Sequence, residues 1–177
     1  MRFKSFCVLV TLMGLLFGRQ VRSFGQTNNL RIAFNGFGGT APIFLGQDAG
    51  IFRKHNLTLE MIFIPGGSLS LQALIGRSLE LLLTGGPPVI NAYLQGAKIK
   101  IIAGTVNLLP YTFVTAAGVR AAEQLKGKKI GISRFGSNTD YVVRLALTQF
   151  AIAPGDVQIV QVGGSQARLL AMKSGAI

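Results

Sequence analysis

The sequence predicts an α/β fold in which parallel sheets are faced by helices, and three observations lead to it. Apolar, strand-like runs alternate with helical segments along most of the chain. Glycine-rich turns follow the apolar runs and open the helices. A strand–glycine–helix pattern near Arg31 returns 98 residues later, near Lys129. This β-α-β-α order is typical of parallel sheets, because two parallel strands are joined by a crossover that is usually a helix.

Seven strands and five helices are expected from the apolar patterns and the glycine, proline and polar residues that flank them. The expected strands are 30–34, 57–64, 79–83, 98–103, 111–115, 129–133 and 157–162. The expected helices are 41–49, 68–75, 87–94, 137–150 and 165–173. The first helix has the clearest end, since Gly50 can take the left-handed conformation of a Schellman turn, with Ile51 as its hydrophobic contact. His55 follows in a turn and is expected to be a solvated residue without catalytic partners.

The first 25 residues are predicted to be a secretory signal peptide. A positively charged start precedes the apolar run 6–18, and small residues at 23–25 offer a cleavage site. A membrane anchor is the alternative, but the run is too short to span about 30 Å of hydrocarbon. Removing residues 1–25 lowers the net charge from +12 to +8 and takes away Cys7, the only cysteine. A mature chain without a thiol suits an oxidising compartment, so a periplasmic or other extracytoplasmic location is expected.

Composition and charge exclude several classes of protein. One cysteine excludes a disulfide framework, and one histidine excludes sites that need two. The basic residues of the mature chain are scattered apart from Lys126, Lys128 and Lys129, so nucleic acid is not an expected partner. The uncharged stretches 81–97 and 101–119 contain prolines and asparagines. They are expected to be buried strands and turns rather than membrane spans.

Five glycine-rich turns indicate where a ligand would bind. They lie at 38–40, 66–68, 85–87, 136–139 and 163–165. A helix N-terminus offers free N–H donors and a partial positive charge, and glycine lets a ligand approach the backbone. Because open α/β sheets bind ligands at the carboxyl ends of their strands, a small anionic or strongly polar molecule is expected there. For each single serine or threonine in these turns, ordinary N-capping is the alternative.

The internal repeat predicts two lobes of similar build. Residues 31–38 match 129–136, and residues 62–68 match 159–165. A chance likeness of two βα units is the alternative, since short apolar runs match easily. Residues 36–41 also fit the G-x-G-x-x-A pattern, with Glu60 further along, as a Rossmann-type dinucleotide-binding unit requires. Serine hydrolysis is not expected, because the sequence contains no G-x-S-x-G.

Several segments, taken in order, resemble the periplasmic substrate-binding proteins of ABC transporters, in the branch for sulfonates, nitrate, taurine and thiamine-precursor pyrimidines. The segments are 41–57, 64–68, 85–87, 125–131 and 133–137. The resemblance runs from Leu30 to the last residue and implies a periplasmic-binding-protein-like fold of type II, with two α/β lobes around a cleft. Lobe 1 is expected over 26–112 and a partial lobe 2 over 113–177, with the crossover at 107–111. Family members continue for about as long again, so the resemblance implies a fragment with a truncated second lobe.

The resemblance also implies a function. It implies a monomeric, non-catalytic receptor without a metal or cofactor, which captures a small anion or pyrimidine-like molecule by hinge closure and delivers it to an ABC permease in the inner membrane. The alternative is an enzyme similar to thiamine-pyrimidine synthases, which rely on a cofactor lysine, histidines and a cysteine cluster. Ligand contacts are expected from loops of both lobes, at Asn35, Phe37, Gly39, Thr40, Gly67, Ser68, Gly85, Gly86, Phe135, Gly136, Ser137, Asn138 and Thr139.

Two side-chain roles are open within this set of loops. Arg134 is a candidate partner for a sulfonate, phosphate or carboxylate, with a solvated surface arginine as the alternative. Phe37 and Phe135 occupy equivalent places in the repeat and are candidates for enclosing an aromatic ligand. Packing beneath the loops is the alternative role for both rings.

Overall fold

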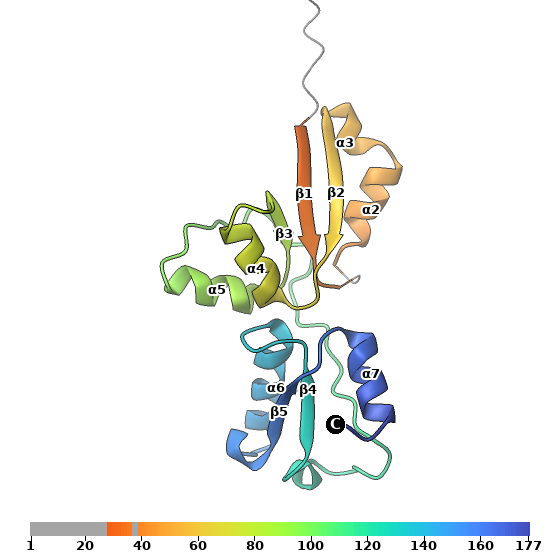
Figure 1. Ribbon diagram of the computed structural model, residues 1–177, viewed down its shortest axis with the longest axis vertical. Helices are drawn as coiled ribbons and strands as arrows, with labels where there is room; N and C mark the ends of the chain where they lie inside the picture. Colours follow the sequence, from red (N-terminus) through yellow and green to blue (C-terminus); the bar gives the residue numbers. More distant parts are fainter. Residues whose placement is uncertain (1–27, 37–38) are drawn as a thin grey trace, which may run out of the picture.

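The computed structural model describes residues 28–36 and 39–177, and it contains two α/β units joined by a long connecting segment (Figure 1). We call the first unit, residues 28–94, lobe 1 and the second, residues 122–177, lobe 2. The predicted signal peptide and Phe37 lie outside the described residues. Within them, no helix is long and apolar enough to cross a membrane.

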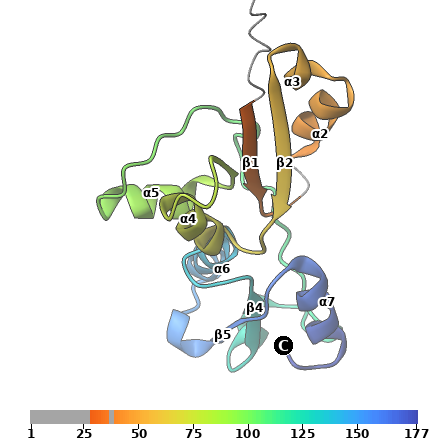
Figure 2. The same ribbon diagram turned by 45° about the horizontal axis from the view of Figure 1, so that its top comes forward.

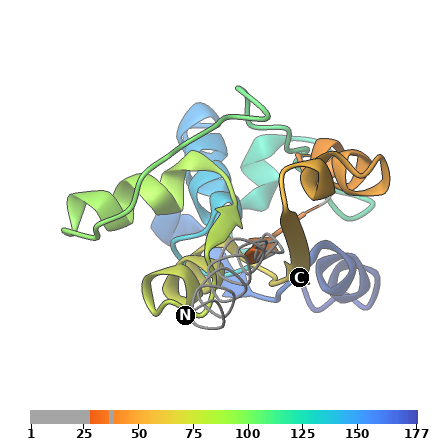
Figure 3. The same ribbon diagram turned by 90° about the horizontal axis from the view of Figure 1, so that it is seen from above.

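Lobe 1 is built on a parallel sheet with the strand order β2-β1-β3. The strands are β1 (Asn28–Phe34), β2 (Leu57–Phe63) and β3 (Leu81–Leu83). Helices α2 (Ala41–Asp48) and α3 (Ile51–Lys54) lie on one face, and α4 (Gly67–Ile75) and α5 (Gly86–Leu94) on the other (Figure 3). The chain goes from β1 to β2 in one direction and then back past β1 to β3. Right-handed crossovers in opposite directions place their helices on opposite faces, which buries the end of β1 at Ile32, Ala33 and Phe34.

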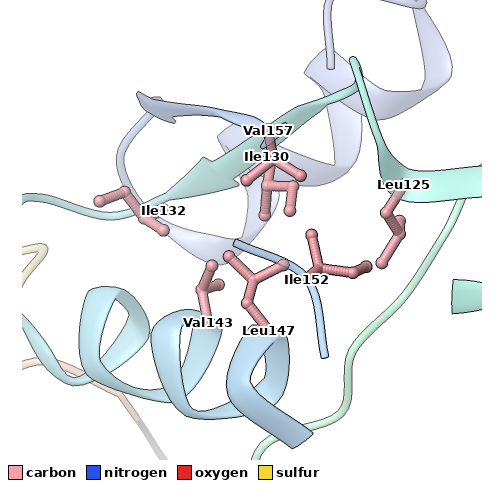
Figure 4. Close-up of a cluster of buried hydrophobic side chains, with 7 residues drawn as sticks. All are labelled: Leu125, Ile130, Ile132, Val143, Leu147, Ile152 and Val157. Atoms are coloured by element: carbon pink, nitrogen blue, oxygen red, sulfur yellow. The ribbon is translucent and has the colours of Figure 1, made fainter. Parts of the chain in front are cut away.

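Lobe 2 has a two-stranded parallel sheet of β4 (Lys129–Ile132) and β5 (Gln158–Gln161). Helix α6 (Asn138–Gln149) lies on one side of β4 and α7 (Ser165–Lys173) on the other (Figure 1). The 3-10 turns η1 (Ala122–Leu125) and η2 (Pro154–Asp156) complete the lobe. Its core joins α6 to the sheet through Leu125, Ile130, Ile132, Val143, Leu147, Ile152 and Val157 (Figure 4).

The end of the first helix agrees with the sequence in one respect and differs in another. Gly50 has φ +69°, which confirms the left-handed conformation. The chain does not turn away at Ile51 but begins the short helix α3, whose last turn contains Arg53 and Lys54. His55 follows α3 and is exposed to solvent.

Two expected strands are wrong. Residues 98–103 and 111–115 are irregular, and Ile101 and Ile102 are 67% and 78% exposed. The expectation that the stretch 101–119 is buried is wrong for the same reason. An apolar run becomes a strand only where a neighbouring strand offers its backbone N–H and C=O groups in register. Neither segment has such a partner among the described residues.

Candidate functional site between the two lobes

The carboxyl ends of the strands in both lobes meet in one region, which we call the junction. The arrowheads of β1 and β2 point towards lobe 2 (Figure 1), and α4 and α5 face α6 (Figure 2). A β-carbon at Gly85, after β3, would lie 2.5 Å from Asn138 Nδ2, after β4. A β-carbon at Gly66, after β2, would lie 3.3 Å from Arg134 Cγ. Glycine-rich turns of both lobes are therefore in direct contact.

The junction contains the topological switch point of the lobe 1 sheet. Neighbouring strands β1 and β3 lead to helices on opposite faces, and ligands of open α/β sheets typically bind beyond the carboxyl ends of strands at such a point. Asn35 follows β1 and Thr84 follows β3. A β-carbon at Gly67 would lie 2.6 Å from Thr84 Oγ1 and 3.7 Å from Asn35 Oδ1. Glycine at position 67 thus allows the start of α4 to pack closely against both side chains.

Asn35 is held in a defined orientation. Its Nδ2 donates hydrogen bonds to the Ile64 carbonyl, 3.0 Å away, and to Ser70 Oγ. Ser70 is fully buried and in turn donates to the Gly66 carbonyl at 3.0 Å. This network ties β1 to the turn before α4. Asn35 enters it through Nδ2, so its Oδ1 takes no part in it.

Other predicted residues of lobe 1 have different surroundings. Thr40 is 1% exposed, and its hydroxyl donates to the Gly36 carbonyl at 2.6 Å, so it closes its own loop. Gly39 faces the connecting segment, since its β-carbon would lie 3.2 Å from Thr105 Oγ1. Ser68 is half-buried in the first turn of α4, and Gly86 is exposed at the start of α5.

The lobe 2 side of the junction contains a cluster of three hydroxyl groups. The Oγ atoms of Ser133 and Ser137 and Oγ1 of Thr139 lie 2.8 to 2.9 Å from one another. Ser137 is also the N-cap of α6 and accepts a hydrogen bond from the Asp140 N–H at 3.5 Å. Ser133 and Ser137 are buried, and Thr139 is half-buried. The hydroxyls predicted to contact a ligand here thus bond to each other.

Asp140 occupies the positive end of α6. Its Oδ2 accepts a hydrogen bond from the Gly136 N–H at 2.8 Å, and its Oδ1 accepts one from Arg144 Nε at 2.9 Å. A carboxylate in the first turn of a helix is stabilised by the helix dipole and by the free N–H groups. The Gly136 N–H, predicted as a ligand donor, is therefore already used, and the start of α6 carries its own anion.

The start of α4 differs from that of α6 because it carries no anion of its own. No acidic residue occupies its first turn, and none occupies that of α5. Pro87 and Pro88 lie in the first turn of α5 and have no N–H, so α4 presents more free donors. The aliphatic part of Arg134 packs against Gly66, the N-cap of α4. Among the described residues, Arg134 forms no salt bridge.

Three buried oxygens of the junction have no hydrogen-bond partner among the described residues. They are Asn35 Oδ1, Thr84 Oγ1 and Asn138 Oδ1. Nearly all buried polar atoms in folded proteins are hydrogen-bonded, because an unpaired one costs about 1–3 kcal/mol. Three such atoms at one place, contributed by both lobes, are the strongest feature of the site.

The sequence identified Asn35 and Asn138 but missed Thr84. Its position in the sequence could have identified it, because Thr84 directly follows the apolar residues of β3 as Asn35 follows those of β1. Phe135 is 49% exposed, and its N–H donates to Gln161 Oε1 at 2.8 Å. Its proposed pairing with Phe37 falls outside the described residues.

The connecting segment passes from lobe 1 to lobe 2 close to the expected crossover. Thr105 and Val106 lie against Gly39 of lobe 1. Phe113 packs on the lobe 2 core, with its ring 6.1 Å from that of Phe150. The passage thus lies between residues 106 and 113, while the lobe boundaries stay a prediction.

Other candidate sites are less developed. Within residues 28–36 and 39–177, no three His, Cys, Asp or Glu residues are grouped as metal ligands. A hollow of about 410 Å³ between α2, α3 and β2 and another of about 400 Å³ beside α5 lie away from the unpaired oxygens.

Known proteins match the chain in sequence. The sequence profile described as NMT1/THI5-like matches residues 39–177. A curated protein of Brucella abortus (strain 2308), named as a binding protein, is 30% identical over 129 residues, which is 72% of this chain and 39% of that protein. A binding protein of Brucella suis biovar 1 (strain 1330) matches to the same extent. The chain thus spans about two fifths of the length of these relatives.

Solved structures match it in fold. A protein of Bordetella bronchiseptica RB50 superposes with a TM-score of 0.62 at 23% identity, over 84% of this chain and 49% of that one. The periplasmic aliphatic sulphonate-binding protein SsuA of Escherichia coli has a TM-score of 0.60 at 21% identity, over 85% and 52%. The alkanesulfonate-binding protein SsuA of Xanthomonas axonopodis pv. citri, bound to MOPS, has a TM-score of 0.62 at 20% identity, over 84% of this chain and 52% of that one.

These likenesses establish the fold expected from the sequence, with two α/β lobes that carry parallel sheets. At identities below one quarter, structural likeness shows the fold and not the ligand. The sequence match covers most of the chain, including the turns of the junction from Gly39 onwards. The chain belongs to the NMT1/THI5-like family and has the periplasmic-binding-protein fold.

Proposed function

We propose that the chain captures a small anionic or polar organic solute at the junction, as the extracytoplasmic solute-binding component of an ABC importer. One observation carries the proposal. The carboxyl ends of both sheets face each other, with Gly85 against Asn138 and Gly66 against Arg134. A solute held there contacts both lobes.

An acidic group of the solute fits best at the start of α4. The N–H groups of Gly67 and Ser68 lie in its first turn, which contains no acidic residue. A helix N-terminus stabilises an anion by about 0.3–1 kcal/mol. Arg134 reaches this turn from lobe 2 and adds a cation that can bond to a sulfonate or carboxylate in a bidentate manner.

This arrangement couples binding to closure of the lobes. The helix start belongs to lobe 1 and the arginine to lobe 2, so an anion bonded to both favours the closed state over an open one. The passage between the lobes, residues 107–112, contains no helix or strand. A few residues of this kind can absorb the rotation of a hinge.

We propose binding without chemical conversion. The junction side chains are amides, hydroxyls, an arginine and the carboxylate of Asp140, which is already bonded to the Gly136 N–H and to Arg144. His55 lies beyond α3 on the surface. The names of the curated relatives and of both SsuA proteins describe binding, which supports the same conclusion. Export through residues 1–25 and delivery to an inner-membrane permease complete the proposal.

Thermal-shift measurements on the full chain test it. The probes are 2-aminoethanesulfonate, MOPS, nitrate and 4-aminopyrimidine, followed by calorimetric titration of those that raise the melting temperature. A solute that binds only the native state stabilises it by about 2.7 kcal/mol at 100 times its Kd. Recovery of the unchanged solute is expected. Absence of any shift, or release of a chemically altered solute, would refute the proposal.

A further inference from the structure

We infer that the captured solute presents neutral N–H or O–H donors to three oxygens of the junction, Asn35 Oδ1, Thr84 Oγ1 and Asn138 Oδ1. This inference rests on the proposed function, because it specifies the chemistry of the solute in the same site. It also differs from what helix N-termini alone indicate, since a bare anion has only acceptors to offer and cannot bond to the amide oxygens of Asn35 and Asn138.

The orientation of the Asn35 amide shows that its unpaired atom is the oxygen, which is a hydrogen-bond acceptor. Its Nδ2 is bonded to the Ile64 carbonyl, which can only accept, so the amide nitrogen and oxygen cannot exchange places. Its Oδ1 is buried and has no partner among the described residues. Thr84 Oγ1 borders the same space next to Gly67 and is also unpaired. Lobe 1 thus supplies two neighbouring oxygens to one small region.

Asn138 supplies the third oxygen from lobe 2. The residue is 9% exposed, its amide lies against Gly85, and its Oδ1 has no partner within the described parts of the chain. Gly85 follows Thr84 directly, so the Asn138 amide of lobe 2 lies next to the lobe 1 turn that contains Thr84. A solute with donors on one face would satisfy acceptors of both lobes together.

The surroundings favour neutral donors over an ammonium group. A buried cation needs an anionic partner, or the cost of its desolvation is not repaid. The carboxylate in the first turn of α6, Asp140, is already bonded to the Gly136 N–H and to Arg144. Arg134 adds positive charge next to the site. A carboxamide, an amino group on an aromatic ring or a hydroxyl meets these conditions.

The first test uses the protein without solute. Thr84→Val keeps the shape of the side chain and removes the unpaired hydroxyl, so its melting temperature is expected to equal or exceed that of the wild type. Thr148→Val, which removes an exposed hydroxyl on α6, is the matched control. A clear fall in melting temperature for Thr84→Val alone would mean that the hydroxyl has a partner, and would overturn the inference while leaving the proposed function intact.

The second test compares solutes that differ by one donor. The pairs are nicotinamide with methyl nicotinate and 4-aminopyrimidine with 4-methylpyrimidine, titrated by calorimetry. The member with N–H donors is expected to bind more tightly, and Thr84→Val and Asn138→Leu are each expected to weaken it about 3- to 10-fold. Thr148→Val is expected to leave the affinity unchanged.

The outcomes separate the two proposals. Equal or tighter binding by the members without donors, or unchanged affinity in both junction variants, would overturn the inference alone. Failure of these four solutes and of the sulfonates and nitrate to bind would overturn the proposed function, and the inference with it.

Discussion

The contact between the lobes at Gly85 leads to the sharpest prediction. Its φ of −74° and ψ of 167° are ordinary extended values, so Gly85→Ala introduces no backbone strain. The new β-carbon would lie 2.5, 2.6 and 2.7 Å from Nδ2, Oδ1 and Cγ of Asn138. Ordinary contacts begin at 3.4 Å, so the Asn138 amide or the whole of lobe 2 has to move by about 1 Å.

The expected loss of solute affinity follows from the steric overlap between the new β-carbon and Asn138. Inserting a methyl group into a filled space costs about 1–3 kcal/mol. This cost applies when the lobes are closed, since an open junction leaves room at position 85. Solute affinity is therefore expected to fall about 5- to 150-fold, while the stability of each lobe changes little.

Gly86→Ala is the matched control. Its β-carbon would meet only Ile90 Cδ1, at 3.7 Å, which is an ordinary contact on the same helix. Calorimetric titration of a solute from the thermal-shift screen compares wild type, Gly85→Ala and Gly86→Ala. Equal affinities in all three proteins would show that the solute is not enclosed between these turns.

Three further predictions concern stability. Thr40→Val removes the 2.6 Å hydrogen bond to the Gly36 carbonyl and should lower the free energy of unfolding, measured by urea titration, by about 1–2 kcal/mol. An unchanged free energy of unfolding would mean that this bond does not stabilise the fold. Leu147→Ala, at a fully buried core position, should cost about 2–5 kcal/mol, against less than about 1 for Leu145→Ala on the exposed side of α6; equal costs would contradict the described core. The hydrogen bonds from Arg31 lower the pKa of Glu80 to about 2. The contribution of these hydrogen bonds to the free energy of unfolding is complete above the unfolded pKa of about 4.5 and is lost as the pH falls towards 2. The difference in free energy of unfolding between wild type and Glu80→Gln should therefore shrink over that pH range. A constant difference would contradict the pairing of Glu80 with Arg31.

Local pattern was sufficient for much of the fold. The strands β1, β2, β4 and β5 and the helix α7 appear within one or two residues of the expected positions. In each, an apolar run of the right period is bounded by glycine or polar residues, so the information lies within a few neighbouring positions. The two wrong strands had the same local pattern. A strand, however, also needs a partner, which is a property of distant parts of the chain.

The candidate site divides in the same way. The sequence by itself determined which turns reach the carboxyl ends of the strands, because helix starts and glycines are local features. Only the tertiary structure decided which polar groups there are left without a partner. It tied the Asn35 amide to Ile64 and Ser70, which are 29 and 35 residues further along the chain, and it left oxygens of Asn35, Thr84 and Asn138 unpaired. The bonds of Gly136 with Asp140 and of Thr40 with Gly36 are local, since each spans four residues. Whether a buried oxygen has a partner depends on side chains that are far apart in sequence and meet only when the two lobes come together.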